Sequence, residues 1–580
     1  MCGIFLYCGK SRDVQELQEC FMRSQHRGPD NTQFIVFYVD EIMIAFGFHR
    51  LSINGLNPKA NQPLFVDHTL TLCNGEIWNS EQMHRSCGTE NTTGSDCECV
   101  PVLYQHLNES TTTHKHEDPF ETLCNTIDGV FGLVLFDRIQ NKICIARDRI
   151  GIRSLYYAVE KDLESATESI FVASELKSIP TTVANVRAFL PGHWGCFSLQ
   201  PNLPQYMRFV TEPYWTLRAS RRIAYLQPDC LPEHLSQQPD YIDCCERLHV
   251  VLTNAVAKRF MSDRSIGCVL SGGLDSTVIT AIACSMHAKR NPTAPPLRTY
   301  TIGMAGGEDL KWARIAAAHF GTEHHEFVIT EQEFLDAIPE VIAQVESYDV
   351  TTVRASTGNW LLAKHIAKLG KDTVLFCGDV ADELLGGYRG FGLTTDADAF
   401  DDETVKMVEH IHRFDVLRCE KSFAGHGLEG RVPFADYDVV DLLMSVPPEF
   451  KMWDGTHRIE KDLLRRAFQD YLPYALTWRR KEAFSDGVSK KERGWSDIIQ
   501  EHLGSRRSGA TPQWTQPDTR VHASPYDAES CYYRELYEGL YSSVEAIPYL
   551  WKQPFCSVAD PSARCLQNYN TTNTTNPNTN

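Results

Sequence analysis

The chain opens with Met1-Cys2-Gly3-Ile4, and Cys2 is its first residue able to act as a nucleophile. Its small side chain permits removal of Met1. Cys2 would then carry a thiol and a free α-amino group, whose ordinary pKa values are about 8.5 and about 7.7–8.0. A thiol beside an amine that can take its proton is an activated nucleophile. Position 2 alone does not establish a site, so its meaning depends on the surrounding residues.

Charged and amide residues nearby indicate a pocket for an amino acid. Asn74 and Gly75 follow the predicted strand Thr69–Cys73, and an amide side chain with a backbone N–H can stabilise the oxyanion of a tetrahedral intermediate. Arg50 can bind a carboxylate through two parallel hydrogen bonds, and Asp96 can bind an ammonium group. Taken singly, Arg50 and Asp96 are more typical of exposed surface charges. Together with the nucleophile they predict an amino-acid site.

A glycine-rich turn in the second half is typical of phosphate binding. It follows the apolar run Ile266–Leu270 and reads Ser271-Gly272-Gly273-Leu274-Asp275-Ser276. The glycines let the backbone approach an anion, the next helix N-terminus directs free N–H groups toward it, and Asp275 can hold Mg²⁺. The turn is not a Walker A loop. Its form is typical of enzymes that cleave ATP between the α- and β-phosphates; the alternative is an ordinary strand-to-helix turn.

Two kinds of scaffold must position these residues. To about residue 205, runs rich in branched and aromatic residues predict layered sheets, with a helix near 14–23. The runs are Gln33–Val39, Ile42–Phe48, Thr69–Cys73, Phe131–Phe136 and Ile143–Arg147. From about residue 266 strands alternate with helices, which predicts a parallel sheet with ligands beyond the carboxyl ends of its strands. After about residue 400 the pattern is mainly helical.

The resulting fold class is an α+β layered sandwich followed by an α/β domain with a parallel sheet and the glycine-rich loop. We predict the first domain over residues 1–205 and a proline-rich linker over 206–240. The second domain then covers 241–565. An Asn/Thr-rich tail over 566–580 is predicted to be disordered.

The motifs together resemble a known family. Segments 1–4, 26–30, 50–53, 74–76 and 146–148 are similar to class II glutamine amidotransferases, whose first domain has the N-terminal nucleophile fold. With the turn at 271–276, they resemble glutamine-hydrolysing asparagine synthetases. Segments 349–356, 429–434, 481–488 and 560–564 are also similar to that family. The resemblance covers about residues 1–565.

For the first domain, the resemblance implies that Cys2 attacks the glutamine side-chain amide, forms a thioester and releases ammonia into an internal tunnel. Asn74 and Gly75 belong to the implied catalytic set. The implied glutamine site comprises Arg50, Leu51, Ser52, Ile53, Asn54, Asn74, Gly75, Glu76 and Asp96.

For the second domain, the resemblance implies that aspartate attacks the α-phosphate of ATP, giving β-aspartyl-AMP and pyrophosphate, and that ammonia displaces AMP. ATP is a substrate and Mg²⁺ the cofactor, with Asp379 and Lys481 catalytic and Asp275 and Asp382 as metal ligands. The implied ATP site comprises Leu270, Ser271, Gly272, Gly273, Asp275, Ser276, Ile302, Cys377 and Gly378. The implied aspartate site comprises Thr351, Thr352 and Arg354.

One loop departs from the family pattern. The usual Ser-Gly-Glu-Gly-Ser-Asp-Glu is here Cys377-Gly378-Asp379-Val380-Ala381-Asp382-Glu383. Asp379 keeps the negative charge on a side chain one methylene shorter, and Val380 replaces a glycine and loses backbone freedom. A misplacement of about 1 Å can cost on the order of 100-fold in rate. This motivates the alternatives of a non-catalytic relative or one with a single active domain, such as a glutaminase. β-Lactam-forming synthetases share the plan, but Cys2 and the segment 349–356 argue against them.

Composition argues against several other classes of protein, namely nucleic-acid-binding and membrane-spanning proteins. The formal net charge of −19 does not suit a nucleic-acid partner, and no apolar run reaches the length of about 20 residues that spans a bilayer. None of the 20 cysteines forms a Cys-x-x-Cys pair. We therefore expect reduced thiols in a cytoplasmic protein whose partners are small-molecule substrates. A homodimer is implied by the resemblance alone.

Overall fold

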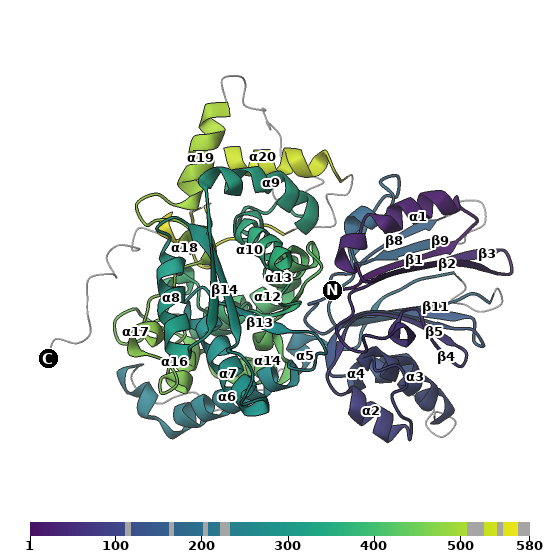
Figure 1. Cartoon of the computed structure of the whole chain (residues 1–580), viewed down its shortest axis with the longest axis horizontal. Coiled ribbons are helices and arrows are strands. Elements are labelled where there is room, and N and C mark those ends of the chain that lie inside the picture. The colour runs from purple at the N-terminus through teal and green to yellow at the C-terminus, as the bar shows by residue number, and fades with distance from the viewer. Residues whose placement is uncertain are drawn as a thin grey trace.

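The computed structural model describes residues 1–110, 118–161, 168–200, 207–220, 232–506, 527–541, 549–558 and 560–565. Its N-terminal half contains two stacked antiparallel sheets between layers of helices (Figure 1). The first, in the order β10-β8-β9-β1-β3-β2, consists of β1 (Gly3–Gly9), β2 (Asn31–Val39), β3 (Ile42–Arg50), β8 (Tyr156–Lys161), β9 (Glu168–Ala173) and β10 (Arg187–Ala188). The second, in the order β12-β11-β7-β6-β5-β4, consists of β4 (Leu64–Val66), β5 (Thr69–Ile77), β6 (Gly129–Asp137), β7 (Lys142–Arg147), β11 (His193–Ser198) and β12 (Glu212–Pro213).

Strand β1 illustrates how the layers share their core. Alternate side chains of a strand point to opposite faces of its sheet. Ile4 and Leu6 accordingly pack in the core between the two sheets, whereas Phe5 and Tyr7 pack on the other face with α1 (Val14–Met22). The outer face of the second sheet is covered by α2 (Ser80–Ser86), α3 (Cys99–Ser110) and α4 (Pro119–Thr126).

One cysteine pair corrects the expectation of reduced thiols. Cys144 of β7 and Cys196 of β11 are register partners and form a disulfide in the structure. The two residues are 52 positions apart in the sequence, and only the pairing of their strands brings them together. The free thiols include Cys2, Cys377 and Cys419, and many of the free thiols are buried.

The second half contains a five-stranded parallel sheet in the order β15-β14-β13-β16-β17. Its strands are β13 (Ile266–Val269), β14 (Arg298–Met304), β15 (Glu323–Ile329), β16 (Val374–Phe376) and β17 (Glu429–Arg431). The chain runs outward from β13 to β15 and returns to the other side of β13 at β16. The strand order therefore reverses between β13 and β16, and ligands of such sheets bind in the crevice at that point. The short strand β17 lies in the region predicted to be mainly helical.

Helices surround this sheet on both faces (Figure 1). They are α6 (Pro239–Lys258), α7 (Leu274–Arg290), α8 (Glu308–Phe320), α9 (Glu331–Val345), α10 (Val350–Leu369), α11 (Ala381–Leu385), α12 (Ala397–His410), α13 (Asp415–Ala424), α14 (Tyr437–Ser445), α15 (Pro448–Lys451), α16 (Asp462–Phe468), α17 (Tyr474–Thr477), α18 (Phe484–Gly487), α19 (Trp495–Arg506) and α20 (Ala528–Glu538), with α5 (Leu217–Ser220) near the junction of the halves. Within the described ranges, no helix combines the length and apolar character needed to cross a bilayer.

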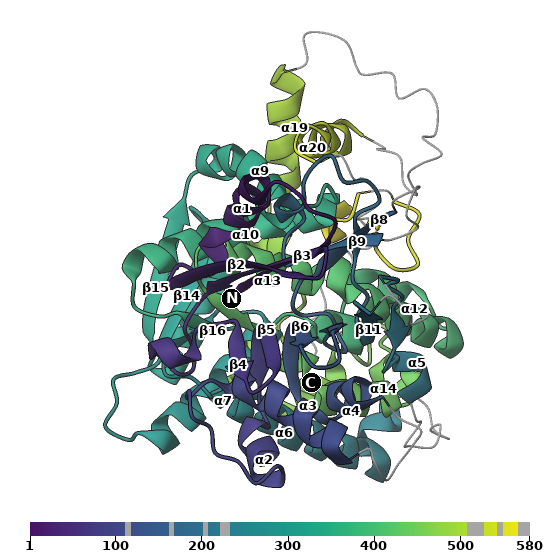
Figure 2. The ribbon, with the colours of Figure 1, turned by 90° about the vertical axis from the view of Figure 1, so that its right-hand side faces the viewer.

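The predicted fold class is confirmed by these two sheet architectures. The domain limits stay predictions. Residues 221–231 of the predicted linker and the whole predicted tail at 566–580 lie outside the described residues. Figure 2 shows the N-terminal half in front of the parallel sheet. Leu51 and Ile53, just after β3, pack against Val374 and Ile266 of that sheet, so the predicted glutamine segment touches the strands that lead to the phosphate turn.

Candidate functional site

The thiol of Cys2 lies at the junction of the two halves, immediately before β1. Its Sγ atom accepts a hydrogen bond from the Leu51 N–H at 3.4 Å and lies 3.6 Å from the Leu51 carbonyl oxygen. Burial raises the pKa of this thiol, and the nearby α-amino group opposes that rise. Burial also lowers the pKa of the Met1 amino group to about 6. An amine with that pKa is mostly neutral at pH 7 and can accept a proton.

Asn74 and Gly75 lie on β5 beside the nucleophile. The Cys2 backbone N–H donates to Asn74 Oδ1 at 3.0 Å, while the Nδ2 atom of Asn74 is buried without a hydrogen-bond partner among the described residues. A side chain at Gly75 would place its Cβ 2.0 Å from the Val130 carbonyl oxygen of β6. The local geometry thus provides an unpaired amide donor next to the thiol and requires glycine at the following position.

The predicted charged groups of the amino-acid site are buried here, not exposed. Arg50 donates to the Asn61 side-chain oxygen at 2.8 Å and to the backbone oxygen of Asn54 at 3.1 Å, and it forms no carboxylate ion pair among the described residues. Asp96 accepts from the Ile77 N–H at 2.7 Å, and burial raises its pKa to about 6. A guanidinium bonded to neutral oxygens keeps its charge available for a ligand carboxylate.

Further members of the predicted glutamine set connect these groups. Asn54 Nδ2 donates to Glu76 at 2.5 Å and lies 3.4 Å from Asp96. Burial raises the pKa of Glu76 well above its ordinary value, although Arg431 lies 3.5 Å from it. The Ser52 N–H donates to Asp30 at 2.8 Å, which holds the segment after β3 in place.

The phosphate turn lies at the point where the strand order reverses. It connects β13 to α7 and lines a cavity of about 150 Å³ at the carboxyl edge of the parallel sheet. Gly272 adopts φ +72°, and a Cβ there would lie 2.3 Å from the Trp312 backbone of α8. Of the predicted ATP residues, Ser271, Gly273, Asp275, Ser276 and Gly378 line the cavity. Leu270, Gly272, Ile302 and Cys377 are buried and are not among the residues that line the cavity.

Two lysines face the acidic groups of the cavity. Lys481 Nζ lies 2.5 Å from Asp382 and 3.8 Å from Asp275. Lys461, which the sequence did not indicate, lies 2.5 Å from both carboxylates. Burial acts against ionisation of Asp382, but the two lysines outweigh it and hold its pKa at about 2. Asp382 is therefore ionised at neutral pH.

The loop that departs from the family pattern reaches the same cavity. The side chain of Asp379 lines the cavity, 3.8 Å from Arg418 of α13. Burial raises its pKa, and Arg418 opposes that rise. Val380 has φ +81°, a left-handed conformation that is strained for a β-branched residue, and its N–H donates to Asp415 at 2.7 Å. The loop keeps the turn that the usual glycine permits, at the cost of local strain.

The predicted aspartate residues lie near the N-terminus of α10 and differ in placement. Thr351 lines the cavity, and its hydroxyl is buried without a hydrogen-bond partner in the described structure. Thr352 does not line the cavity, since its hydroxyl donates to Asp349 at 2.7 Å within the helix cap. Arg354 lines the cavity, but its guanidinium forms ion pairs with Glu529 at 2.7 Å and Asp560 at 2.9 Å. Its charge is already neutralised by protein carboxylates.

Each half of the chain matches a known protein family. Residues 1–191 match the glutamine amidotransferase domain family, and residues 247–397 and 392–564 match the asparagine synthase family. The glutamine-hydrolyzing asparagine synthetase of Gallus gallus is 33% identical over 589 residues, covering 98% of this chain and 99% of that protein. Those of Homo sapiens (over 589 residues) and Cricetulus griseus (over 592) are 34% and 35% identical, each with 98% of this chain and 99% of theirs covered. The chain belongs to the glutamine-hydrolysing asparagine synthetase family.

Several cavity residues of this family member were missed by sequence reasoning. They come from segments with no phosphate-binding signature and are Asp309, Tyr388, Arg418, Lys461, Arg479 and Arg480, whereas Glu383 belongs to the loop 377–383 that was compared with the family pattern. Burial and the neighbouring Asp382 raise the pKa of Glu383 to about 7, and Tyr388 donates to Glu383 at 2.5 Å. The position of Lys461 could not be inferred locally, because Lys461 and Asp275 are 186 residues apart.

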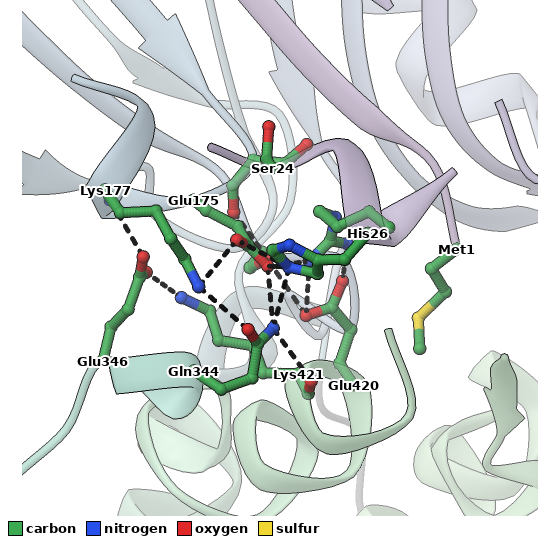
Figure 3. Close-up of polar contacts among 12 residues, drawn as sticks. Met1, Ser24, His26, Glu175, Lys177, Gln344, Glu346, Glu420 and Lys421 are labelled. Atoms are coloured by element: carbon green, nitrogen blue, oxygen red, sulfur yellow. Dashed lines mark hydrogen bonds and ion pairs between the residues drawn. The ribbon is translucent and has the colours of Figure 1, made fainter. Parts of the chain in front are cut away.

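A buried polar cluster joins the two halves of the asparagine synthetase fold (Figure 3). Arg27 Nε donates to the Cys2 carbonyl oxygen at 2.7 Å, and the same guanidinium pairs with Glu175 at 3.1 Å and with Glu420 of α13. Lys421 of α13 pairs with Glu346 after α9. Helix α13 therefore reaches both sites. Its Glu420 pairs with the Arg27 side chain that binds the Cys2 carbonyl oxygen, and its Arg418 lines the synthetase cavity.

Proposed function

We propose that the chain synthesises asparagine from aspartate and ATP with nitrogen from glutamine. The Cys2 thiolate attacks the glutamine amide carbon, Asn74 Nδ2 and the Gly75 N–H stabilise the oxyanion, and the α-amino group of Cys2 passes a proton to the departing ammonia. Water then hydrolyses the thioester to glutamate. This role is supported by the unpaired Asn74 amide beside the thiol.

Arg50 and Asp96 would bind the two charged ends of the glutamine main chain. The guanidinium of Arg50 has only neutral oxygen partners among the described ion pairs and hydrogen bonds, which suits an incoming carboxylate. Asp96, ionised above pH 6, suits the ammonium group. Glu76 and Asn54 would keep Asp96 in place.

In the second half, the aspartate β-carboxylate attacks the α-phosphorus of ATP and pyrophosphate leaves. Ammonia then attacks the β-carbonyl carbon and AMP leaves, giving asparagine. The backbone N–H groups at the start of α7 would bind phosphate oxygens, and Lys461 and Lys481 would stabilise the charge that develops on them. Asp379 lines the same cavity and would contact the reacting groups.

Asp275 and Asp382 would hold Mg²⁺. The Oδ1 atom of Asp275 is buried without a hydrogen-bond partner among the described residues, and hard carboxylate oxygens are the ligands that Mg²⁺ prefers. When bound, the ion neutralises charge on the pyrophosphate oxygens.

The observation that carries the proposal is the presence of both assembled sites in one chain, Cys2 with Asn74 and the phosphate turn with Asp382 and Lys481. The test incubates the protein with Mg-ATP, aspartate and either glutamine or ammonium, and quantifies asparagine and pyrophosphate. The parent should use both nitrogen sources, and Cys2→Ala should use ammonium alone. Glutamate release without pyrophosphate or asparagine would overturn the synthetase half.

We also propose a cytoplasmic homodimer, on the family resemblance alone. Light scattering of the eluted protein measures its mass in solution. A mass of one chain at micromolar concentration would contradict the dimer, and fractionation of cells expressing the tagged chain tests the compartment.

A further inference from the structure

A second cluster of ligating atoms lies in the wall of the synthetase cavity. The Sγ atoms of Cys377 and Cys419 and a carboxylate oxygen of Asp379 all lie within 4.8 Å of one another. Cys377 follows β16, Asp379 lies in the next loop and Cys419 is on α13. Both cysteines are 2% exposed, whereas the side chain of Asp379 is 20% exposed and faces the cavity. The cluster can therefore be reached from one side only.

We propose that Cys377, Cys419 and Asp379 form a binding site for a thiophilic divalent cation, of the class of Zn²⁺ or Cd²⁺. Thiolate sulfurs select such ions over Mg²⁺ and Ca²⁺. In a tetrahedral zinc site, bonds of about 2.3 Å place two sulfurs about 3.8 Å apart. Since sulfur and oxygen lie about 3.6 Å apart in such a site, three ligand atoms within 4.8 Å need to contract by about 1.2 Å at most. Water from the cavity that Asp379 lines would supply the fourth ligand.

The surrounding charges suit such a centre. Two thiolates and one carboxylate carry three negative charges, so the site with a bound divalent cation has a net charge of −1. Arg418, 3.8 Å from Asp379, offsets part of that remainder, although it also pairs with Asp415. Buried charge is tolerated when it is paired or coordinates a metal. The Cys377 thiol, now 3.7 Å from the Leu375 carbonyl oxygen, and the Cys419 thiol would each lose a proton to solvent on binding.

Occupation of the site has a consequence for catalysis, and this part rests on the role proposed for Asp379. A cation held by Asp379 withdraws that carboxylate from the substrates. The bound cation would therefore inhibit asparagine formation and leave the Cys2 site untouched. Binding of the cation itself does not depend on the proposed function.

The test uses full-length Cys2→Ala protein, so that the reactive thiol of the first half does not bind the probe. Cd²⁺ alone is titrated, and the thiolate-to-cadmium ultraviolet absorption and the bound metal after dialysis are measured. One equivalent should bind with the thiolate signal. Cys419→Ser should weaken this binding at least about tenfold (about 1.4 kcal/mol). Cys124→Ser, which removes a buried thiol of the first half, is the matched control and should bind as the parent does.

Equal binding by the parent, Cys419→Ser and Cys124→Ser would overturn the site. Asp379→Asn provides a second variant should Cys419→Ser fail to fold; it should weaken Cd²⁺ binding and keep the thiolate signal. Ammonia-dependent asparagine synthesis separates the two claims. If Cd²⁺ abolishes that activity in the parent and Cys419→Ser keeps it at the same Cd²⁺ concentration, both the cation site and the role of Asp379 are supported. Binding without inhibition would support the site and overturn the role of Asp379.

Discussion

The backbone N–H of Cys2 donates a 3.0 Å hydrogen bond to the Oδ1 atom of Asn74. This contact determines the orientation of the Asn74 amide, because its oxygen is engaged and its nitrogen is left as the free donor beside the thiol. A single side chain thus positions the nucleophile's backbone and offers the hydrogen bond that an oxyanion needs.

Replacing Asn74 by aspartate separates these two roles. The carboxylate of the variant would still accept the hydrogen bond from Cys2 but has no N–H to donate, so we expect Asn74→Asp to lower the kcat of glutamine hydrolysis by about 10²–10³-fold. Glutamate release measures the change, with ammonia-dependent asparagine synthesis as the internal control. A comparable loss of the ammonia-dependent rate would mean that Asn74 acts on the whole fold.

The pH dependence of glutamine use should reflect Asp96. Burial raises its pKa to about 6, so the carboxylate is ionised above pH 6 and protonated below it. Only the ionised form attracts the ammonium group of glutamine, and we therefore expect kcat/KM for glutamine to fall about tenfold for each pH unit below 6. Stopped assays of glutamate release from pH 5 to 8 measure the profile. A profile that stays level down to about pH 4.5 would contradict the role of Asp96.

Lys461 should matter for both folding and catalysis. Lys461→Met would leave Lys481 as the remaining ion-pair partner of Asp275 and Asp382 among the described residues, and breaking a buried ion pair costs about 3–5 kcal/mol. We expect that loss of unfolding free energy, measured by denaturant titration, together with loss of pyrophosphate release. The half-exposed Lys406 pairs with Glu403 on the surface, and Lys406→Met should cost less than about 1 kcal/mol. Equal effects of the two variants would contradict a special role for Lys461.

The phosphate turn should tolerate only glycine at position 272. Gly272 and Gly321 share left-handed φ values of +72° and +66°, but a Cβ meets the Trp312 backbone only at Gly272. Gly321→Ala therefore measures the backbone strain alone, about 1–2 kcal/mol, with pyrophosphate release unchanged. Gly272→Ala adds the clash and should also abolish pyrophosphate release. Normal activity in Gly272→Ala would show that the turn can move away from α8.

The sequence alone determined the features that depend on neighbouring residues. Runs rich in branched and aromatic residues located strands such as β3 and β5, and the hexapeptide at 271–276 indicated the phosphate turn, because both patterns lie within a few consecutive residues. Cys2 and Asn74 were identified from the chemistry of their side chains and then from the family resemblance, and the structure joins them by a hydrogen bond across 72 positions.

Tertiary structure alone decided the partners of the charged groups. Arg354 was predicted to bind aspartate, and that role stays a prediction; it lines the cavity, and its ion-pair partners Glu529 and Asp560 are 175 and 206 positions away. Lys461 faces Asp275 across 186 positions, and the disulfide of Cys144 with Cys196 depends on the pairing of β7 with β11. A buried charge is stable only when it is paired, and its partner can come from any part of the folded chain. Residue type and spacing along the sequence therefore do not predict which partner it has.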